Sequence, residues 1–112
     1  MERIRAIIKR PDEAIGHVTN ISPSLKNLQN IVGGYIETVT LCNSTPSWTI
    51  ICNEEGRLLD LPYNCTIGGV DFCGDIIAVG VDGENLTDLP AEITKRKWGE
   101  MIEMINGLLV TP

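Results

Sequence analysis

Apolar residues recur along this chain with the two spacings that distinguish strands from helices. Runs with the alternation or the β-branched content of strands lie at residues 3–9, 14–21, 35–42, 48–52 and 75–81. The alternation is clearest at 35–42, where one face would carry Tyr35, Glu37, Val39 and Leu41. Turn residues separate most of the runs, so we expect these strands to pair mainly antiparallel.

A first helix is predicted at residues 22–32. Ser22 has the side chain of an N-cap, and Pro23 suits the first helical position. Helical spacing then places on one face Leu25, Leu28, Ile31 and Val32. The glycine pair at 33–34 is expected to end this helix, with one glycine at positive φ.

A second helix is predicted from about residue 90 to 106. Its apolar stripe would consist of Trp98, Met101, Ile102, Ile105 and Leu109, and Gly107 would cap it. The order of strands, helix, strands and helix predicts an α+β fold with a mainly antiparallel sheet, one central helix and one C-terminal helix. Its length predicts a single domain over residues 1–112.

The middle of the chain, at residues 51–64, changes abruptly from apolar to acidic. Residues 53–56 (Asn-Glu-Glu-Gly) are predicted to form a hairpin turn in which Gly56 is left-handed, and an apolar segment would resume at 57–59. Residues 61–64 (Leu-Pro-Tyr-Asn) would then leave the sheet, because proline does not fit a central ladder. The glycine pair at 68–69 and residues 71–75 are predicted to be loop.

Composition and charge narrow the classes of partner. The chain has 112 residues, of which 43% are hydrophobic and 21% charged, and its formal net charge is −6. The negative charge disfavours nucleic acid as a partner. No apolar run reaches the roughly 18 residues of a membrane span, and the N-terminal apolar segment is too short for a signal peptide. We therefore expect a cytoplasmic protein that has no membrane partner.

The cysteines are not spaced like metal ligands. The four are Cys42, Cys52, Cys65 and Cys73, with no C-x-x-C pair, and the single histidine, His17, lies far from them in sequence. A zinc site usually has tight paired spacing. We expect free, buried thiols in a reducing compartment and no bound metal.

The sequence contains no arrangement typical of catalysis. His17 has no serine or cysteine partner signature nearby and is expected at or near the surface of a hairpin strand. Glu54 and Glu55 are adjacent in a turn and would point in different directions, which favours a solvated turn over an acid–base pair. We therefore expect a non-enzymatic protein that needs no cofactor.

Several residues of the middle segment are candidates for ligand binding. The ring of Tyr63 would stack on a base, because it lies in a proline-containing loop outside the expected core. The amide of Asn64 would pair with a base edge, although asparagine in such loops also bonds the backbone. Arg57 would meet a phosphate.

Further candidates surround this segment. Tyr35 would add stacking on a base, and Asn53 and Glu37 would add hydrogen bonds that give specificity. Lys95 and Arg96 belong to the basic cluster at 95–97. That cluster has two interpretations: a solvated helix face, or phosphate capture across a subunit boundary.

Four motifs occur in an order that resembles a known family. They are residues 32–37 (Val-Gly-Gly-Tyr-Ile-Glu), 52–58 (Cys-Asn-Glu-Glu-Gly-Arg-Leu), 61–64 (Leu-Pro-Tyr-Asn) and 75–80 (Asp-Ile-Ile-Ala-Val-Gly). Together they are similar to a domain of unknown function that is common in phages, prophages and plasmids of Firmicutes. The resemblance covers most of residues 3–85. It departs at Cys65, where the family usually has a basic residue, so charge for an anionic ligand would come from Arg57 or from residues 95–97.

The phage setting that this resemblance implies suggests counter-defence. We expect a homo-oligomeric anti-defence "sponge" that binds and sequesters a cyclic nucleotide or cyclic ADP-ribose immune signal. One alternative is an acidic protein-binding inhibitor, of the antirestriction or DNA-mimic type, that docks on a host defence enzyme. The scatter of acids among turns disfavours a mimic, which needs them in rows: Glu37, Glu54, Glu55, Asp60 and Asp82. The other alternative is a structural or assembly protein without a small ligand.

Overall fold

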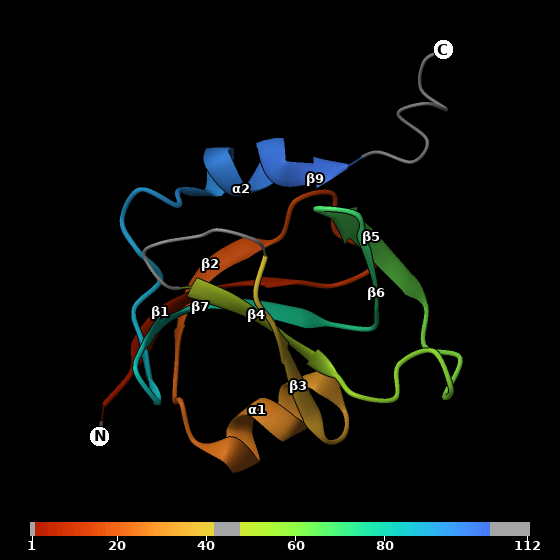
Figure 1. Cartoon of the computed structure of the whole chain (residues 1–112), viewed down its shortest axis with the longest axis horizontal. Coiled ribbons are helices and arrows are strands. Elements are labelled where there is room, and N and C mark those ends of the chain that lie inside the picture. Colours follow the sequence, from red (N-terminus) through yellow and green to blue (C-terminus); the bar gives the residue numbers. More distant parts are fainter. Residues whose placement is uncertain (1, 42–47, 104–112) are drawn as a thin grey trace.

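The fold consists of one large sheet, one small sheet and two helices (Figure 1). The computed structural model describes residues 2–41 and 48–103. In chain order the elements are β1 (Ile4–Lys9), β2 (His17–Ile21), α1 (Leu25–Val32), β3 (Ile36–Val39), β4 (Trp48–Asn53), β5 (Tyr63–Ile67), β6 (Val70–Cys73), β7 (Ile76–Asp82), β8 (Asn85–Thr87), α2 (Lys95–Met101) and β9 (Ile102–Glu103). All pairs among these strands are antiparallel, so the predicted α+β class with a mainly antiparallel sheet is confirmed.

The larger sheet has the strand order β2-β1-β7-β4-β3, and β8 also pairs with β7. Every residue of β4 is buried, as are the first five of β7, because both strands lie in the middle of the sheet. A strand that is covered on both faces reads as a nearly continuous apolar run. The strands predicted at 3–9, 48–52 and 75–81 are therefore confirmed to within one residue at each end.

The helix α1 begins two residues later than the sequence predicts. The N-cap is Ser24, whose hydroxyl accepts a hydrogen bond from the amide of Asn27 at 3.2 Å. Ser22 lies before the helix, where its carbonyl accepts a bond from Asn27 Nδ2 and its hydroxyl accepts one from the Ser24 amide. The prediction of Ser22 as N-cap and Pro23 as first helical residue is thus wrong. The predicted helix end is confirmed, since Gly33 is the C-cap and has φ 80.

The molecule has three layers with an apolar core at each of the two interfaces. The helix α1 covers one face of the large sheet, and the small sheet together with α2 covers the other face (Figure 1). The first core packs α1 against the sheet and includes Ile4, Ala6, Ile8, Leu28, Val32, Ile51, Ile77 and Val79. The second packs the small sheet and α2 against the opposite face and includes Ile7, Trp48, Ile50, Cys52, Ile67, Phe72, Ile76, Ala78 and Trp98. Alternate residues of β4 enter different cores, as a strand requires.

The small sheet was not predicted. Its strand order is β6-β5-β9, and β5 and β6 form a hairpin around the glycine pair at 68–69. The prediction that residues 71–75 are loop is wrong, because Val70–Cys73 is β6. Residues 61–64 do leave the large sheet, but they lead directly into β5, which begins at Tyr63.

The acidic turn after β4 is not a hairpin turn. Residues 54–60 form a compact helical-type turn. The amide of Leu59 donates a hydrogen bond to the carbonyl of Glu55, and the amide of Leu61 donates one to the carbonyl of Gly56. Asp60, with φ 57, has the left-handed backbone that was predicted for Gly56. Gly56 instead lies close to the end of β6, where a Cβ would be 3.1 Å from the carbonyl oxygen of Cys73 and the two segments would have to move slightly apart. Leu58 is 83% exposed, so the predicted apolar segment at 57–59 does not form a strand.

The helix α2 is shorter than predicted at both ends. It begins after Thr94, whose hydroxyl accepts a bond from the amide of Lys97, and it ends at Met101. Ile102 and Glu103 then pair with β5 as β9. The helix predicted from about 90 to 106 is therefore wrong at 90–94 and 102–103. The remaining predicted positions, Ile105, Gly107 and Leu109, lie outside the described residues.

Candidate functional site

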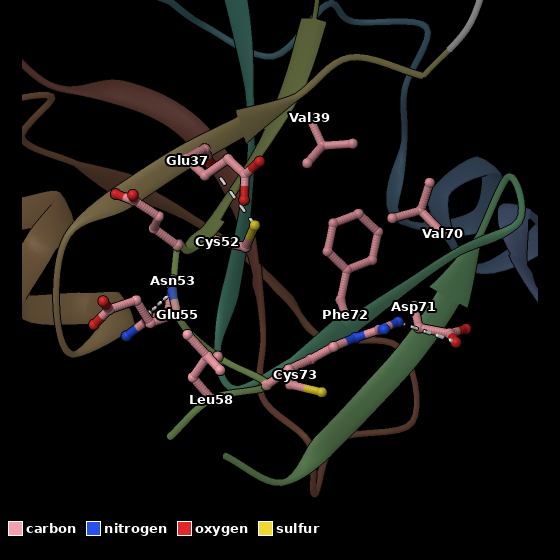
Figure 2. A pocket seen from close by; sticks show the side chains of 13 residues that line it. Glu37, Val39, Cys52, Asn53, Glu55, Leu58, Val70, Asp71, Phe72 and Cys73 are labelled. Atoms are coloured by element: carbon pink, nitrogen blue, oxygen red, sulfur yellow. Dashed lines mark hydrogen bonds and ion pairs between the residues drawn. The ribbon is translucent and has the colours of Figure 1, made fainter. Parts of the chain in front are cut away.

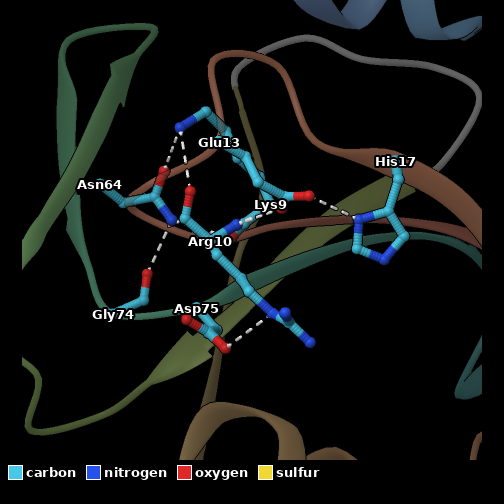
Figure 3. Close-up of polar contacts among 7 residues, drawn as sticks. All are labelled: Lys9, Arg10, Glu13, His17, Asn64, Gly74 and Asp75. Carbon is cyan, nitrogen blue, oxygen red and sulfur yellow. Dashed lines mark hydrogen bonds and ion pairs between the residues drawn. The ribbon is translucent and has the colours of Figure 1, made fainter.

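A buried polar junction attaches the β5–β6 hairpin to the large sheet (Figure 3). The Oδ1 atom of Asn64 accepts a hydrogen bond from Lys9 Nζ at 2.8 Å. Its Nδ2 atom donates to the carbonyl oxygens of Lys9 at 2.8 Å and Gly74 at 2.7 Å. Lys9 and Asn64 are 3% and 8% exposed. The amide of Asn64 is therefore used within the fold, which is the role the sequence left as the alternative to base recognition.

Asn53, the last residue of β4, connects the acidic turn to the end of α1. Its Nδ2 atom donates to the carbonyl of Val32 at 3.1 Å, and its Oδ1 atom accepts from the amide of Glu55 at 2.7 Å. Gly34 is required beside it, because a Cβ there would lie 2.8 Å from Asn53 Nδ2. The amide of Glu54 donates to the carbonyl of Tyr35, which joins the same two segments again. A helix-end carbonyl and two turn amides at this corner therefore have their hydrogen-bond partners within the fold.

Segments that carry the four motifs lie against one another, and the first two motifs line one groove through Glu37 and residues 52–58. The helix end and β3 contact the acidic turn through Asn53, and the turn reaches the end of β6 through Gly56. The amide of Gly74 donates to the carbonyl of Pro62, which brings the third motif against the start of β7. Residues far apart in sequence are thus neighbours at one edge of the molecule.

The groove lies between the two sheets, where β3 and β4 face β6 (Figure 2). Its volume is about 300 Å³, the lower end of the range for small-molecule sites. The lining residues are Glu37, Val39, Cys52, Asn53, Glu54, Glu55, Gly56, Arg57, Leu58, Val70, Asp71, Phe72 and Cys73. In Figure 2 the ring of Phe72 lies at the centre, with Glu37 on one side and Asp71 on the other.

The rim of the groove is mainly acidic. Carboxylates come from Glu37, Glu54, Glu55 and Asp71, and Arg57 is the single basic residue of the lining. Arg57 Nη2 lies 3.5 Å from Asp71 Oδ2 in an ion pair whose side chains are 73% and 48% exposed. An exposed pair of this kind contributes at most about 1 kcal/mol, so a ligand competes with it readily.

Asp71 is the centre of a polar chain on the outer face of the hairpin. The hydroxyl of Thr66 donates to Asp71 Oδ1 at 2.5 Å, and the hydroxyl of Tyr63 bonds to that of Thr66. Tyr63 is 45% exposed and does not line the groove. Its ring is thus oriented by the hairpin and not presented to the groove.

The described thiols are free, and burial suppresses the ionisation of two of them. Burial, together with the charge of Glu37, raises the pKa of Cys52 to about 11. Burial likewise raises the pKa of Cys65 to about 11, against the opposing charge of Lys9. Cys73 is partly exposed, and Cys42 lies outside the described residues. Neither of the two buried thiols has the character of a nucleophile at neutral pH.

The structure brings together some of the predicted site residues and not others. Arg57, Asn53 and Glu37 line the groove. Tyr35 is 70% exposed and outside the lining, as are Tyr63 and Asn64. Lys95 and Arg96 are exposed on α2 and do not reach the groove; Arg96 Nε lies 3.4 Å from Glu100 Oε2.

The β6 wall of the groove was missed, although the sequence contains a signal for it. Two glycines directly between Ile67 and Val70 are the pattern of a two-residue hairpin turn. That reading places Asp71 and Phe72 on a strand, which is where the structure has them. The polar residues of β5 concealed the pattern, because they weaken its apolar alternation.

A wider depression beside α1 is less suited to hold a ligand. It has a volume of about 750 Å³ and is bordered by α1, β3 and β8. Among its lining residues only Leu28 and Ile51 are buried, so most of it is open surface. In the described ranges 2–41 and 48–103, no cluster of three or more His, Cys, Asp or Glu side chains could hold a metal ion. Within the same ranges no helix is long and apolar enough to cross a membrane.

The fold and the groove define a class: an α+β protein in which two antiparallel sheets enclose a lateral groove with an apolar floor and an acidic rim. Within that class the chain belongs to the DUF3846 family, a domain of unknown function, whose family model matches residues 4–103. Searches of curated proteins and of solved structures found no match.

Proposed function

We propose that this protein is a non-enzymatic binding protein whose groove captures a positively charged segment of a partner protein. The observation that carries the proposal is the charge of the rim, where the carboxylates of Glu37, Glu54, Glu55 and Asp71 outnumber the single guanidinium of Arg57. Acids that are scattered in the sequence are gathered here by folding. This weakens the argument against an acidic, protein-binding inhibitor, since three of the five acids that are scattered in the sequence, Glu37, Glu54 and Glu55, border the groove.

The electrostatics of the whole chain support the same partner. A net charge of −6 attracts a basic partner at long range and raises its rate of association. At close range the apolar floor, formed in part by Val39, Phe72 and Val70, accepts the aliphatic parts of lysine or arginine side chains. Both effects disfavour a ligand that carries several phosphates.

The resemblance to phage-encoded proteins supports a biological setting for this capture. A small acidic protein made in an infected cell would dock on a basic surface of a host defence protein in the cytoplasm. Inhibition would then come from occupying that surface, and no reaction would be required of the groove.

Binding of labelled peptides tests the proposal. Fluorescence anisotropy is measured with a short peptide of alternating lysine and valine and with its counterpart of alternating glutamate and valine. We expect the lysine peptide alone to bind, and its affinity to fall as salt is added.

Charge variants locate the binding. Glu37→Gln and Asp71→Asn should each weaken the lysine peptide about two- to fivefold. Glu92→Gln is the matched control, because Glu92 is exposed and lies outside the groove. Equal effects of all three variants would show that only the overall charge matters, and the groove assignment would then be wrong.

A second candidate function remains the sequestration of a cyclic nucleotide or cyclic ADP-ribose signal by an oligomer. The observation in its favour is the position of Arg57, which is exposed at the rim of the groove that Asn53 and Glu37 also line. One groove of about 300 Å³ is small for such a ligand, so a second copy would have to complete the site. Calorimetry with cyclic nucleotides on the wild type and on Arg57→Ala decides this candidate, with Arg3→Ala as the matched control because Arg3 is exposed and lies outside the groove.

A further inference from the structure

We infer that the groove accepts its partner as an added β-strand along the free edge of β6; this inference rests on the function proposed above. It names the mode of binding and the shape of the partner, which is an extended segment that carries lysine or arginine.

The groove follows the edge of β6 and not merely one of its faces. Consecutive side chains of a strand point to opposite faces, yet the groove is lined by all of Val70, Asp71, Phe72 and Cys73. A space that touches both faces of one strand must pass around its edge. Among the described strands β6 pairs only with β5, so this edge is open on the groove side.

The turn of the hairpin determines which backbone groups point outward. Gly68 and Gly69 both have positive φ, at 58 and 80, as a two-residue type I′ turn requires. Ile67 and Val70 flank this turn and are therefore the hydrogen-bonded pair of the ladder. The next pair, Thr66 and Asp71, is the non-hydrogen-bonded one, so the N–H and C=O groups of Asp71 point away from β5. They are the donor and acceptor that an added strand would meet.

The length of the free edge limits the added strand. At the Cys73 end the acidic turn closes the edge, since a Cβ on Gly56 would lie 3.1 Å from the Cys73 carbonyl oxygen. At the other end Gly68 lies against Leu41, whose Cδ2 would be 3.4 Å from a Cβ on that glycine. The segment between them, Val70–Phe72, spans about 10 Å at the usual rise per residue.

The two sides of the edge call for different side chains on the partner. On the inner side Val39 and Val70, which are only partly buried, offer apolar contact beside the buried ring of Phe72. On the outer side the carboxylate of Asp71 lies next to the edge, where it already contacts Arg57 and Thr66. A partner with alternating apolar and basic residues matches both sides, which is how strand addition obtains its specificity. Charge on an edge also discourages pairing with a purely apolar strand.

The first experiment separates strand addition from charge attraction alone. The peptide of alternating lysine and valine is compared with the same peptide N-methylated at every residue, which keeps each side chain but cannot form a ladder. Strand addition predicts at least about tenfold weaker binding of the methylated peptide. Equal binding of both would overturn this inference and leave the proposed function standing. If neither peptide binds, the proposed function fails as well.

The second experiment observes the edge directly and needs no variant. Amide hydrogen exchange of Asp71 is followed by NMR in the free protein and in the saturated complex with the lysine–valine peptide. Strand addition predicts rapid exchange in the free protein and at least about tenfold slower exchange in the complex. Unchanged exchange in the complex would overturn the inference. So would protection that already exists in the free protein and increases with its concentration, because a second copy would then occupy the edge.

Discussion

Two polar junctions hold the β5–β6 hairpin, and they differ in burial. The junction of Asn64 with Lys9 and Gly74 is closed to water, and its donors and acceptors are matched within the fold. The junction of Arg57 with Asp71 lies at the rim of the groove, where both side chains are largely exposed. Each joins the hairpin to another segment, but only the second is accessible to a partner.

This difference explains why neighbouring residues of similar chemistry have different roles. A buried polar group that loses its partner cannot turn to water, so each contact of Asn64 is expensive to remove. An exposed ion pair exchanges its partner for water or for a ligand at little cost. We therefore assign Asn64 to the stability of the fold and Arg57 and Asp71 to binding, and the following variants test that division.

The largest effect is expected for Asn64→Ala. The change removes all three hydrogen bonds and leaves the Lys9 ammonium buried with only the carbonyl of Arg10, at 3.4 Å, as a remaining partner. We expect the free energy of unfolding to fall by about 3 kcal/mol in urea denaturation. Asn85→Ala, on an exposed position of β8, is the control and should stay within about 0.5 kcal/mol of the wild type. A loss below about 1 kcal/mol for Asn64→Ala would refute the structural role.

A smaller effect is expected for the coupling between Lys9 and Asn64. In a double-mutant cycle, Lys9→Met and Asn64→Leu should each destabilise the protein, and the double variant should lose less than the sum. We expect a coupling free energy of about 1–3 kcal/mol from thermal or urea unfolding. Strict additivity would mean that the two side chains do not depend on each other.

Replacement of Arg57 should leave stability almost unchanged but alter binding. Arg57→Ala should shift the free energy of unfolding by less than about 0.5 kcal/mol, because the ion pair is exposed. It should increase the affinity for the lysine–valine peptide about two- to fivefold, because the Asp71 carboxylate loses its ion-pair partner.

The same variant distinguishes the two candidate functions. If nucleotides are the ligands, Arg57→Ala should lower the affinity for them about tenfold or more, because a charge-assisted hydrogen bond to phosphate is lost. Anisotropy and calorimetry on the same preparation decide between the outcomes.

The smallest effect concerns pH and a carboxylate beside the buried junction (Figure 3). Burial raises the pKa of Asp75, with support from Asp12 and Glu13 and against the charge of Arg10, whose Nε lies 3.8 Å away. A carboxyl group whose pKa is raised by folding stabilises the protein at pH values below its pKa in the unfolded chain. This stabilisation is lost as pH rises through its pKa in the folded protein.

The melting temperature of Asp75→Asn relative to the wild type should therefore increase between about pH 3 and pH 6. Glu13→Gln provides the contrast. The hydrogen bond from the Arg10 amide and the contacts with His17 outweigh burial and lower the pKa of Glu13, so its stabilisation is lost as pH falls. Parallel pH profiles for the two variants would contradict the assignment.

Local patterns were sufficient for the central strands of the large sheet, whereas β2 begins later than the predicted 14–21, β3 ends before the predicted 35–42 does, and β8 was not predicted. β1, β4 and β7 are short segments made up mainly of apolar residues, a pattern that local sequence shows by itself. The same holds for the end of α1, where Gly33 supplies the left-handed residue that a C-cap uses.

The groove could be predicted only in part. Asn53 and Arg57 are predicted from the acidic turn and Glu37 from the hydrogen bonds its carboxylate can accept, and all three line the groove. Asp71 and Phe72 were assigned to a loop, since β5 and β6 are short and carry polar residues that blur the alternation. Asn64 was selected for its amide, but whether an amide faces a ligand or a buried lysine is decided by a residue 55 positions away.

The sequence alone determined the secondary structure that depends on local spacing: the central strands, the first helix and the α+β class. Only the tertiary structure decided which strands form a second sheet, where α2 ends and which polar groups are accessible. The physical reason is that helix and strand periodicity is set by neighbours within a few residues, whereas burial and partner choice depend on long-range packing. Glu37 and Asp71 border the same groove because the sheets bring β3 and β6 together, and no local pattern specifies that approach.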